Sequence, residues 1–537
     1  MPKPSPTASR EIRFAIATEF PLVHWQARCI EALADVDGVV LERWVQVSPG
    51  RPRGRRGSGS GALEVVVVPD ALSSLGRDGS PPQPPEQPAV EGMVDILLDL
   101  SSRGVDAPVD WATEVWRFRY GEGLSADPTR AVLVDYVRAP GRTRVALVTE
   151  PSGEIVREGR LSWWRGEQLD RILLDPAFWP ATAALDRTNP RMGEDAVAAA
   201  EEGDDSSVLA TVTRRIGRTS RLPRPLLEVA AATRRTFQAA AVLTRHDDWH
   251  IGIVDAPIEK VLALGRNIDV RWLPGWRGRF AADPFGLERA GILHVFFEDF
   301  DQRRGRGTIS HVAIAADGTV GEPELVLDPG VHTSYPFLVE HAGETFLLPE
   351  TSAASKLVLY QAVEFPNRWQ PVVTMLEDVP VVDASVIEYE GRWWMFGTRL
   401  DRGANHNLFI WHAPELTGPW LPHAANPVKT DARSSRPGGT PFIADGLLYR
   451  PSQDDSLAYG GQVVLNQVQV LTPRAFAERP VGSIGPQPGS PYPDGLHTLS
   501  RAGNRTLIDG NNRHFVGETF RRDVKARLRP ERPGTRP

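Results

Sequence analysis

One hairpin pattern recurs five times between Asp283 and Asp509, and this repeat constrains the fold more than any other feature. Each copy runs from an opening residue through an apolar segment, a glycine-containing turn and a second apolar segment to a closing residue. Two such segments joined by a tight turn predict a β-hairpin. The opening residues are Asp283, Tyr335, Asp383, Thr440 and His497, and the closing residues are Glu298, Glu350, Thr398, Gln453 and Asp509.

The spacing of the copies predicts how the hairpins assemble. The opening and closing residues lie 15 apart in the first three copies, and 13 and 12 apart in the last two. Successive copies begin 52, 48, 57 and 57 residues apart, a period typical of propeller blades. Each blade is a four-stranded sheet around a central channel. We therefore predict an all-β five-bladed β-propeller over residues 241–525, with the segment Trp249–Val254 completing the fifth blade.

The region before the repeat has a different pattern. Strands are expected at Ile12–Thr18 and Val39–Val47, with a helix at Trp25–Leu33 between them, which predicts a βαβ unit with a right-handed crossover. Further strands are expected at 63–68, 94–100, 143–149 and 155–161. The chain is thus predicted to be multidomain, with an N-terminal open α/β (Rossmann-like) domain over 12–189, a helical connector over 190–240, and disordered tails at 1–11 and 526–537.

Composition excludes several classes of function. The single cysteine, Cys29, rules out an intramolecular disulfide and a thiolate metal cluster. A net charge of −7 disfavours a sequence-independent nucleic-acid binder. The sequence shows no apolar signal core and no apolar stretch of about 18 residues, so we expect a soluble, cytoplasmic protein without a transmembrane segment.

The repeat also predicts where a functional site lies. The first strand of each propeller blade lines the channel, so the opening residues should converge there and the closing residues should gather at one rim. Converging carboxyl groups raise one another's pKa, and paired carboxylates are what glycosidic bond cleavage requires. The candidate catalytic residues are Asp283, Glu350 and Asp383, and the candidate substrate-binding residues are Glu298, Tyr335, Arg436, Gln453, His497, Asp509 and Trp393. The sequence identifies no cofactor and predicts no metal site, and it leaves open whether a cation occupies the channel.

These residues also allow purely structural interpretations. Aspartates that follow loops often hydrogen-bond turn amides, which applies to Asp283 and Asp383. Glu298 could pair with Arg303 or Arg304 on its own loop. Tryptophans such as Trp393 more often pack between blades than bind sugar rings.

Two resemblances sharpen the expectation for the propeller. The motif Ala282-Asp283-Pro284 resembles the start of the first blade in five-bladed glycoside hydrolases of the arabinanase and xylosidase type. That resemblance implies a general base at Asp283, with an acid and a pKa modulator on later blades, which we assign to Glu350 and Asp383.

Residues 240–525 resemble more closely the N-terminal propeller of the plant glucosamine inositolphosphorylceramide transferases and their bacterial relatives. The matching stretches are Ala282-Asp-Pro-Phe-Gly, Phe297-Glu-Asp-Phe-Asp, Ser334-Tyr-Pro-Phe, Leu348-Pro-Glu-Thr, Val382-Asp-Ala-Ser-Val, Gly418-Pro-Trp, Asn426-Pro-Val and Arg450-Pro-Ser-Gln-Asp. The plant proteins carry a separate glycosyltransferase domain after the propeller. No such segment follows here, so we do not expect that transferase activity to carry over.

The N-terminal domain resembles, more weakly, formyltransferases that use a folate donor, through the stretches at 94–100 and 114–121. Those enzymes use a run of the form Asn-x-His-x-Ser-x-Leu-Pro, which this sequence lacks, so formyl transfer is expected to be lost.

Three functional hypotheses follow. The first is a carbohydrate-active enzyme that acts on a glycosidic bond of a glycan, glycolipid or sugar nucleotide. The second is a non-catalytic carbohydrate-binding or scaffold protein of polysaccharide or glycolipid assembly. The third is a formyl or acyl transferase that acts on a sugar substrate.

Overall fold

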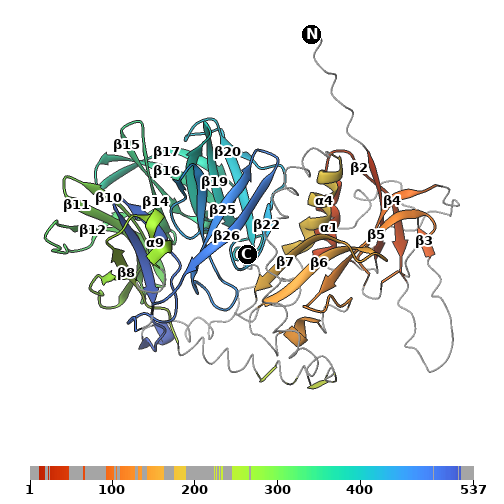
Figure 1. The fold of residues 1–537 in the computed structure, drawn as a ribbon, viewed down its shortest axis with the longest axis horizontal. Helices are drawn as coiled ribbons and strands as arrows, with labels where there is room; N and C mark the ends of the chain where they lie inside the picture. The colour runs from red at the N-terminus through yellow and green to blue at the C-terminus, as the bar shows by residue number, and fades with distance from the viewer. Residues whose placement is uncertain are drawn as a thin grey trace, which may run out of the picture. The chain divides into compact units, whose positions relative to one another are not determined.

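A computed structural model of the chain divides into two compact units, residues 1–163 with 167–231 and residues 232–537 with 164–166 (Figure 1). The predicted disordered tails and most of the predicted connector at 190–240 lie outside the described residues. No helix among the described residues is long and apolar enough to cross a membrane. The structure describes residues 11–18, 22, 24–47, 64–66, 92–101, 104–105, 109–126, 131–135, 142–162, 175–188, 223, 225–226, 229, 232–233, 245–264, 268–487, 489–517 and 519–521.

The first unit contains a seven-stranded mixed sheet in the order β3-β2-β1-β4-β5-β6-β7. The central strands β2, β1, β4 and β5 are parallel, and β3, β6 and β7 extend the sheet antiparallel. The strands are β1 Ile12–Thr18, β2 Val39–Gln46, β3 Glu64–Val66, β4 Val94–Asp99, β5 Ala112–Tyr120, β6 Arg142–Glu150 and β7 Ile155–Ser162, and the helices are α1 His24–Ala34, η1 Asp175–Phe178 and α4 Trp179–Thr188.

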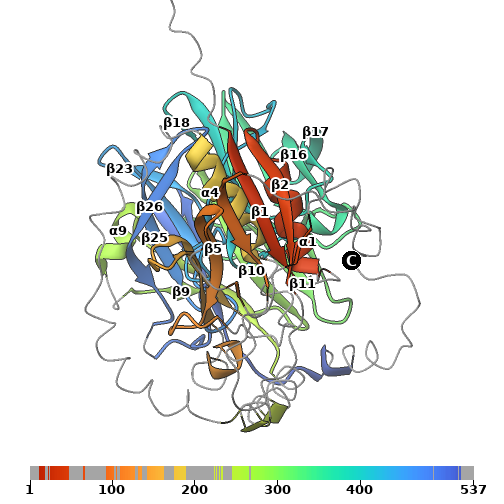
Figure 2. The same ribbon diagram turned by 90° about the vertical axis from the view of Figure 1, so that its right-hand side faces the viewer.

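Alternation along β1 explains how this sheet is buried on both faces. Helices α1 and α4 lie beside the strands of this sheet (Figure 2). Phe14 and Ile16 pack in one cluster with residues of these helices, whereas Ala15 and Ala17 belong to a cluster on the other face. The predicted β1-α1-β2 unit is confirmed, because β1 and β2 are adjacent and parallel. β5 and α4 were not predicted. A Rossmann-like or formyltransferase-like identity for this unit stays a prediction.

The second unit confirms the five-bladed propeller, with five sheets of which four have four strands and the third has five. Blade one contains β10 Arg279–Arg289, β11 Ile292–Asp301, β12 Arg306–Ile314 and β13 Glu324–Leu327, and blade two contains β14 Ser334–His341, β15 Glu344–Glu350, β16 Lys356–Glu364 and β17 Arg368–Glu377. Blade three contains β18 Val381–Tyr389, β19 Arg392–Arg399, β20 Asn407–Ala413, β21 Leu421–Pro422 and β22 Lys429–Thr430. Blade four contains β23 Phe442–Ala444, β24 Leu447–Gln453, β25 Val463–Leu471 and β26 Phe476–Ile484.

The fifth blade closes the ring with strands from both ends of the unit. Its order is β27 Leu499–Ala502, β28 Arg505–Asn511, β8 Trp249–Val254 and β9 Arg271–Trp272, and the helix α9 Ile258–Leu264 lies between β8 and β9 in the chain. β8 pairs antiparallel with β28, from Thr506 opposite Val254 to Asn511 opposite Trp249. The predicted closure by Trp249–Val254 is therefore confirmed. Because β8 and β9 continue the sheet beyond β28, the edge of β28 is paired rather than exposed.

Candidate functional site

The first three blades share a backbone irregularity at their opening residue. Asp283, Tyr335 and Asp383 have positive φ angles of 51°, 45° and 53°, and each interrupts the register of its hairpin. A non-glycine residue in this left-handed region is uncommon, and such strain concentrates at functional sites. The residue before each bulge pairs with the closing residue, as Ala282 pairs with Glu298. The 15-residue spacing thus reflects one repeated bulged hairpin that holds the opening and closing residues close together.

Asp283 is buried, and neighbouring blades hold its carboxylate. Its Oδ1 accepts a hydrogen bond from Thr498 Oγ1 at 3.0 Å, and its Oδ2 accepts one from the Tyr335 amide at 3.3 Å. Burial is the main cause that raises the pKa of Asp283 to about 6, and the charge of His497 opposes this rise. The residue is therefore mostly ionised at neutral pH although it lies inside the propeller.

Asp383 is the carboxylate that a cation balances directly. Its Oδ2 accepts hydrogen bonds from Arg436 Nε at 2.6 Å and from Gln453 Nε2 at 2.7 Å. Only 3% of the Asp383 side chain and 13% of the Arg436 side chain is exposed. Tyr459 supports the guanidinium group, whose central carbon lies 5.0 Å from its ring centroid.

Glu350 lies beside this pair, and its pKa is raised. Its Oε1 accepts a hydrogen bond from Ser352 Oγ at 2.7 Å, and its Oε2 accepts one from the Asp383 amide at 3.2 Å. Burial, and next the charge of Asp383, raise the pKa of Glu350 to about 8. Glu350 is therefore mostly protonated at neutral pH, unlike Asp283.

Glu298 is a second acidic group that burial favours in its neutral form. Burial, and next the charges of Asp283 and Glu350, raise its pKa well above the usual range. Its carboxyl group lies over Gly307, where an added Cβ would come within 2.4 Å of Oε1. His332 Nε2 lies 3.6 Å from Glu298 Oε1, and burial lowers the pKa of His332, whereas Arg304 pairs with Asp301.

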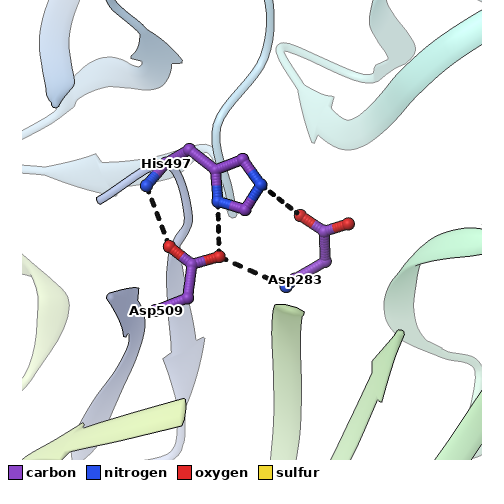
Figure 3. Close-up of side chains that lie close together, drawn as sticks. All are labelled: Asp283, His497 and Asp509. Atoms are coloured by element: carbon purple, nitrogen blue, oxygen red, sulfur yellow. Dashed lines mark hydrogen bonds and ion pairs between the residues drawn. The ribbon is translucent and has the colours of Figure 1, made fainter. Parts of the chain in front are cut away.

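His497 lies between two carboxylates from different blades (Figure 3). Its Nδ1 is 2.5 Å from Asp509 Oδ2 and its Nε2 is 3.5 Å from Asp283 Oδ1. The Nδ1 contact is an ion pair without hydrogen-bond alignment. Burial alone would lower the pKa of His497, but the charges of Asp509 and Asp283 outweigh it and raise the pKa to about 9.

Potential metal-ligating atoms of Asp283, His497 and Asp509 lie within 4.8 Å of one another. Both nitrogens of the His497 ring are, however, directed at carboxylates that already balance its charge. This arrangement is the geometry of a carboxylate–imidazolium–carboxylate cluster, in which the ring occupies the place that a cation would take.

The loop that carries Arg436 rests on a buried ionic network that the sequence analysis missed. Arg450 is fully buried and donates to the carbonyl oxygens of Ser435 at 3.1 Å and Ser434 at 2.6 Å. Glu478 pairs with Arg450 at 2.6 Å and with Lys429 at 2.8 Å, and Lys429 in turn donates to Ser434 Oγ. The only signal in the sequence was Arg450 directly after the apolar run Leu447-Leu-Tyr449 of a predicted hairpin, which indicates a buried partner.

Two predicted binding residues lie elsewhere than expected. The indole of Trp393 is 6% exposed and packs in the apolar cluster of blades two and three, beside His341 at 5.2 Å. Its face is covered, so we correct its assignment as a sugar platform. Tyr335 is fully buried, and its hydroxyl group contacts Ser385 Oγ at 2.8 Å and accepts from the Gly439 amide at 2.6 Å. It therefore braces the inner strands rather than presenting its hydroxyl group to the channel.

Asp99, at the end of β4, is the least exposed carboxylate among the described residues of the first unit. Asp99 accepts hydrogen bonds from the Val105 amide, from Ser101 and from Arg117 Nε at 2.9 Å. These contacts fix the turn after β4, which accounts for the residue structurally. The predicted formyltransferase-like identity of this unit gains no support from them.

Comparison with known proteins shows which sequence family the propeller resembles. Residues 272–487 match the family model described as Glucosamine inositolphosphorylceramide transferase 1, N-terminal. Curated relatives with the name Glucosamine inositolphosphorylceramide transferase 1, from Oryza sativa subsp. japonica and Arabidopsis thaliana, are 35% and 33% identical over 213 and 210 residues. The resemblance indicated by the sequence motifs is thus confirmed for the propeller.

These matches cover 38% of this chain, and 28% and 27% of the two relatives. The chain therefore spans less than a third of the length of the curated relatives it matches. Among solved structures, an exo-β-1,3-galactanase from Clostridium thermocellum matches with a TM-score of 0.32 and 11% identity, covering 39% of this chain and 53% of that one. A family 117 glycoside hydrolase from Zobellia galactanivorans matches with a TM-score of 0.33 and 12% identity, covering 48% and 96%. Both likenesses are distant.

Proposed function

We propose that this carbohydrate-active propeller cleaves or transfers at a glycosidic bond of a glycan or glycolipid, through the carboxyl groups at its channel. Glu350 acts as the general acid, Asp283 as the general base, and Asp383 sets the proton affinity of Glu350. The observation that carries the proposal is the difference between two buried carboxyl groups. The pKa of Glu350 is about 8 and that of Asp283 about 6, so at neutral pH one holds a proton and the other does not.

That pair supplies both proton transfers that the reaction needs. Glu350 donates its proton to the leaving oxygen as the bond from the anomeric carbon to that oxygen breaks. Asp283 removes the proton of the attacking hydroxyl group, which belongs to water in hydrolysis, as the new bond to the anomeric carbon forms. Arg436 and Gln453 hold the Asp383 carboxyl group in place beside Glu350.

The printed name of the curated relatives suggests which substrates to test first. Those proteins are named for the transfer of glucosamine to inositolphosphorylceramide, a sphingolipid with an inositol phosphate headgroup. We extend to this chain only the substrate class, sugars joined to such headgroups, because the match covers less than a third of the relatives.

The experiment compares the full-length wild type with Asp283→Asn and Glu350→Gln on a panel of aryl glycosides and glycosyl inositolphosphorylceramides. We expect each variant to lose about 10²- to 10⁴-fold in turnover, because each loses one proton transfer. Calorimetry should show that both variants still bind the substrate. Asp401→Asn is the matched control, because Asp401 is a half-exposed aspartate that pairs with Arg399 on the same unit. Full activity in both carboxyl variants would refute the proposal.

A second function has its own supporting observation. Both oxygens of Asp283 already accept hydrogen bonds, and Oδ2 of Asp383 is held by Arg436 and Gln453. Carboxylates restrained in this way suit a rigid binding site for sugar hydroxyl groups without catalysis. If the wild type and all carboxyl variants bind one ligand of the panel and none turns it over, the protein is a carbohydrate-binding module.

A further inference from the structure

The His497 ring is restrained on every side, which makes it a fixed part of the channel. It is 2% exposed and stacks on Trp249 with 3.9 Å between ring centroids and 16° between planes. Tyr459 contacts it edge-on at 5.4 Å. The loop backbone closes over it at Gly460, where an added Cβ would come within 2.9 Å of His497 Cβ.

Asp509 holds both the His497 ring and the backbone around it. Its Oδ1 accepts a hydrogen bond from the His497 amide at 2.8 Å (Figure 3). The same oxygen accepts one from the Thr498 amide at 3.0 Å. Its Oδ2 accepts one from the Asp283 amide at 3.2 Å and also faces His497 Nδ1. Asp509 is fully buried, and its contacts fix the position of Asp283 relative to the ring.

We infer that His497 is a positioning residue that, held by Asp509, orients Asp283 and keeps it ionised as the base of the reaction. This inference rests on the proposed function, because it assigns His497 a role through Asp283. The ring presents Nε2 to Asp283 Oδ1, the same oxygen that accepts the Thr498 hydroxyl. The other oxygen faces the Tyr335 amide. The carboxylate is therefore restrained at both oxygens, and the ring places a positive charge beside it.

The surrounding charges explain why this one cation matters. Burial raises the pKa of Asp283, and so do the charges of Asp383 and Asp509, whereas His497 is the main influence that lowers it. The ring carries that charge at neutral pH because Asp509 and Asp283 face it directly. The other charged or titratable groups that act on this cluster or contact it include Asp383, Asp455, Tyr459, Glu298 and Tyr335.

The test is a titration of Asp283 that needs no substrate. Full-length protein labelled with ¹³C at aspartate carboxyl carbons is titrated by NMR, and the Asp283 resonance is assigned by its loss in Asp283→Asn. In His497→Gln, we expect the Asp283 midpoint to rise from about 6 by about 1 unit or more, because an opposite charge is removed. His423→Gln is the control, since His423 is also 2% exposed but hydrogen-bonds the Ala425 amide instead. An unchanged Asp283 midpoint in folded His497→Gln would overturn the inference.

A second measurement covers the case in which His497→Gln does not fold. In the ¹⁵N-histidine wild type, the His497 ring should titrate near 9, and in Asp509→Asn its midpoint should fall. A wild-type midpoint at or below the ordinary histidine value of about 6.5 would overturn the inference without any variant. If substrate turnover is found, the acid limb of kcat/KM should move to higher pH in His497→Gln. If no turnover is found, the proposed function fails while these titrations still decide the electrostatic role of His497.

Discussion

The first three blades and the last two contribute different chemistry to the same channel. Blades one to three supply the bulged aspartates Asp283 and Asp383 and the closing acids Glu298 and Glu350. The segments of blades four and five supply the groups that set their charge, which are Arg436, Gln453, and His497 with Asp509. The shorter hairpins of blades four and five have no positive φ at their opening residues.

This difference shows that a repeated backbone geometry does not bring the same side-chain chemistry to every blade. The same bulge redirects the side chain of the opening residue in three blades, at Asp283, Tyr335 and Asp383. Yet only two of these three side chains are acidic, and Tyr335 braces the inner strands instead. Acid groups packed this closely require opposite charge nearby, and the blades that lack the bulge provide it.

The division between blades that supply acids and blades that supply their partners is tested most directly by removing Arg436, the cation that holds Asp383. Arg436→Met should lower the free energy of unfolding by about 3–5 kcal/mol, because it leaves a buried carboxylate without its partner. Denaturant unfolding at pH 7 measures the loss. The control is Arg399→Met, whose partner Asp401 is 46% exposed and whose loss should be at most about 1 kcal/mol. Equal losses in the two variants would show that blade four does not support the acids.

The close packing of Glu298 against Gly307 tests how tightly the acidic groups of the first three blades are confined. Gly307→Ala adds a Cβ that would lie 2.4 Å from Glu298 Oε1 and 2.8 Å from the Thr333 carbonyl oxygen. We expect a loss of about 1–3 kcal/mol in the free energy of unfolding from overpacking. Gly485→Ala is the control, because its nearest atom, Gln462 Cβ, would be 3.4 Å away, an ordinary contact. If the two alanine variants unfold alike, the Glu298 carboxyl group is not confined by Gly307.

The protonation of Glu350 predicts how stability depends on pH. Its pKa rises from a usual 4.5 to about 8 on folding, so the folded state binds more protons between these values. The free energy of unfolding should therefore fall as pH rises from 4.5 to 8, with Glu350 contributing up to about 1.4 kcal/mol per pH unit. In Glu350→Gln this fall should be shallower, as measured by denaturant unfolding at pH 5, 6, 7 and 8.

Glu377→Gln provides the matched control for this pH series, because Glu377 is an exposed glutamate of blade two. Its slope should equal that of the wild type. If the free energy of unfolding of Glu350→Gln changed with pH as steeply as that of the wild type, Glu350 would be ionised in the folded state. The assignment of Glu350 as the general acid would then be wrong.

The smallest expected effect concerns the hydrogen bond that Glu350 receives. Ser352→Ala removes the donor at 2.7 Å from Oε1, and the loss should be about 0.5–1.5 kcal/mol at pH 7 because the carboxyl group is neutral. Thr498→Val removes the donor to the ionised Asp283, where about 1.5–3 kcal/mol is expected. Denaturant unfolding of both variants measures the contrast. A larger loss for Ser352→Ala than for Thr498→Val would reverse the protonation states inferred for the two acids.

Much of the fold could be predicted because the repeat is local. Each hairpin has its apolar segments and turn within about 15 residues. The prediction that Trp249–Val254 completes the fifth blade is confirmed by its pairing with β28. The position of Trp393 was mispredicted for a physical reason. Both faces of β19 are buried, so the alternation of apolar and polar residues that reveals the inward face is absent.

The partners of the acids could not be predicted because they are distant in the chain. Arg436 lies 53 residues after Asp383, and Thr498 lies 215 residues after Asp283. The repeat period predicts which residues of separate blades converge, but it does not predict which individual side chains pair, because that depends on how the ring closes. The buried Arg450–Glu478 pair beneath the Arg436 loop escaped prediction for the same reason.

The sequence by itself determined the number of blades, the closing strand and the equivalent opening and closing positions of the hairpins, because periodicity and turn chemistry act between near neighbours. Only the tertiary structure decided which acid is protonated. Asp283, Glu298, Glu350 and Asp383 are all carboxyl groups, and their differences arise from burial and from charges that other blades bring within a few ångströms. The proton affinity of a group is a property of its surroundings, and here those surroundings come from distant parts of the chain.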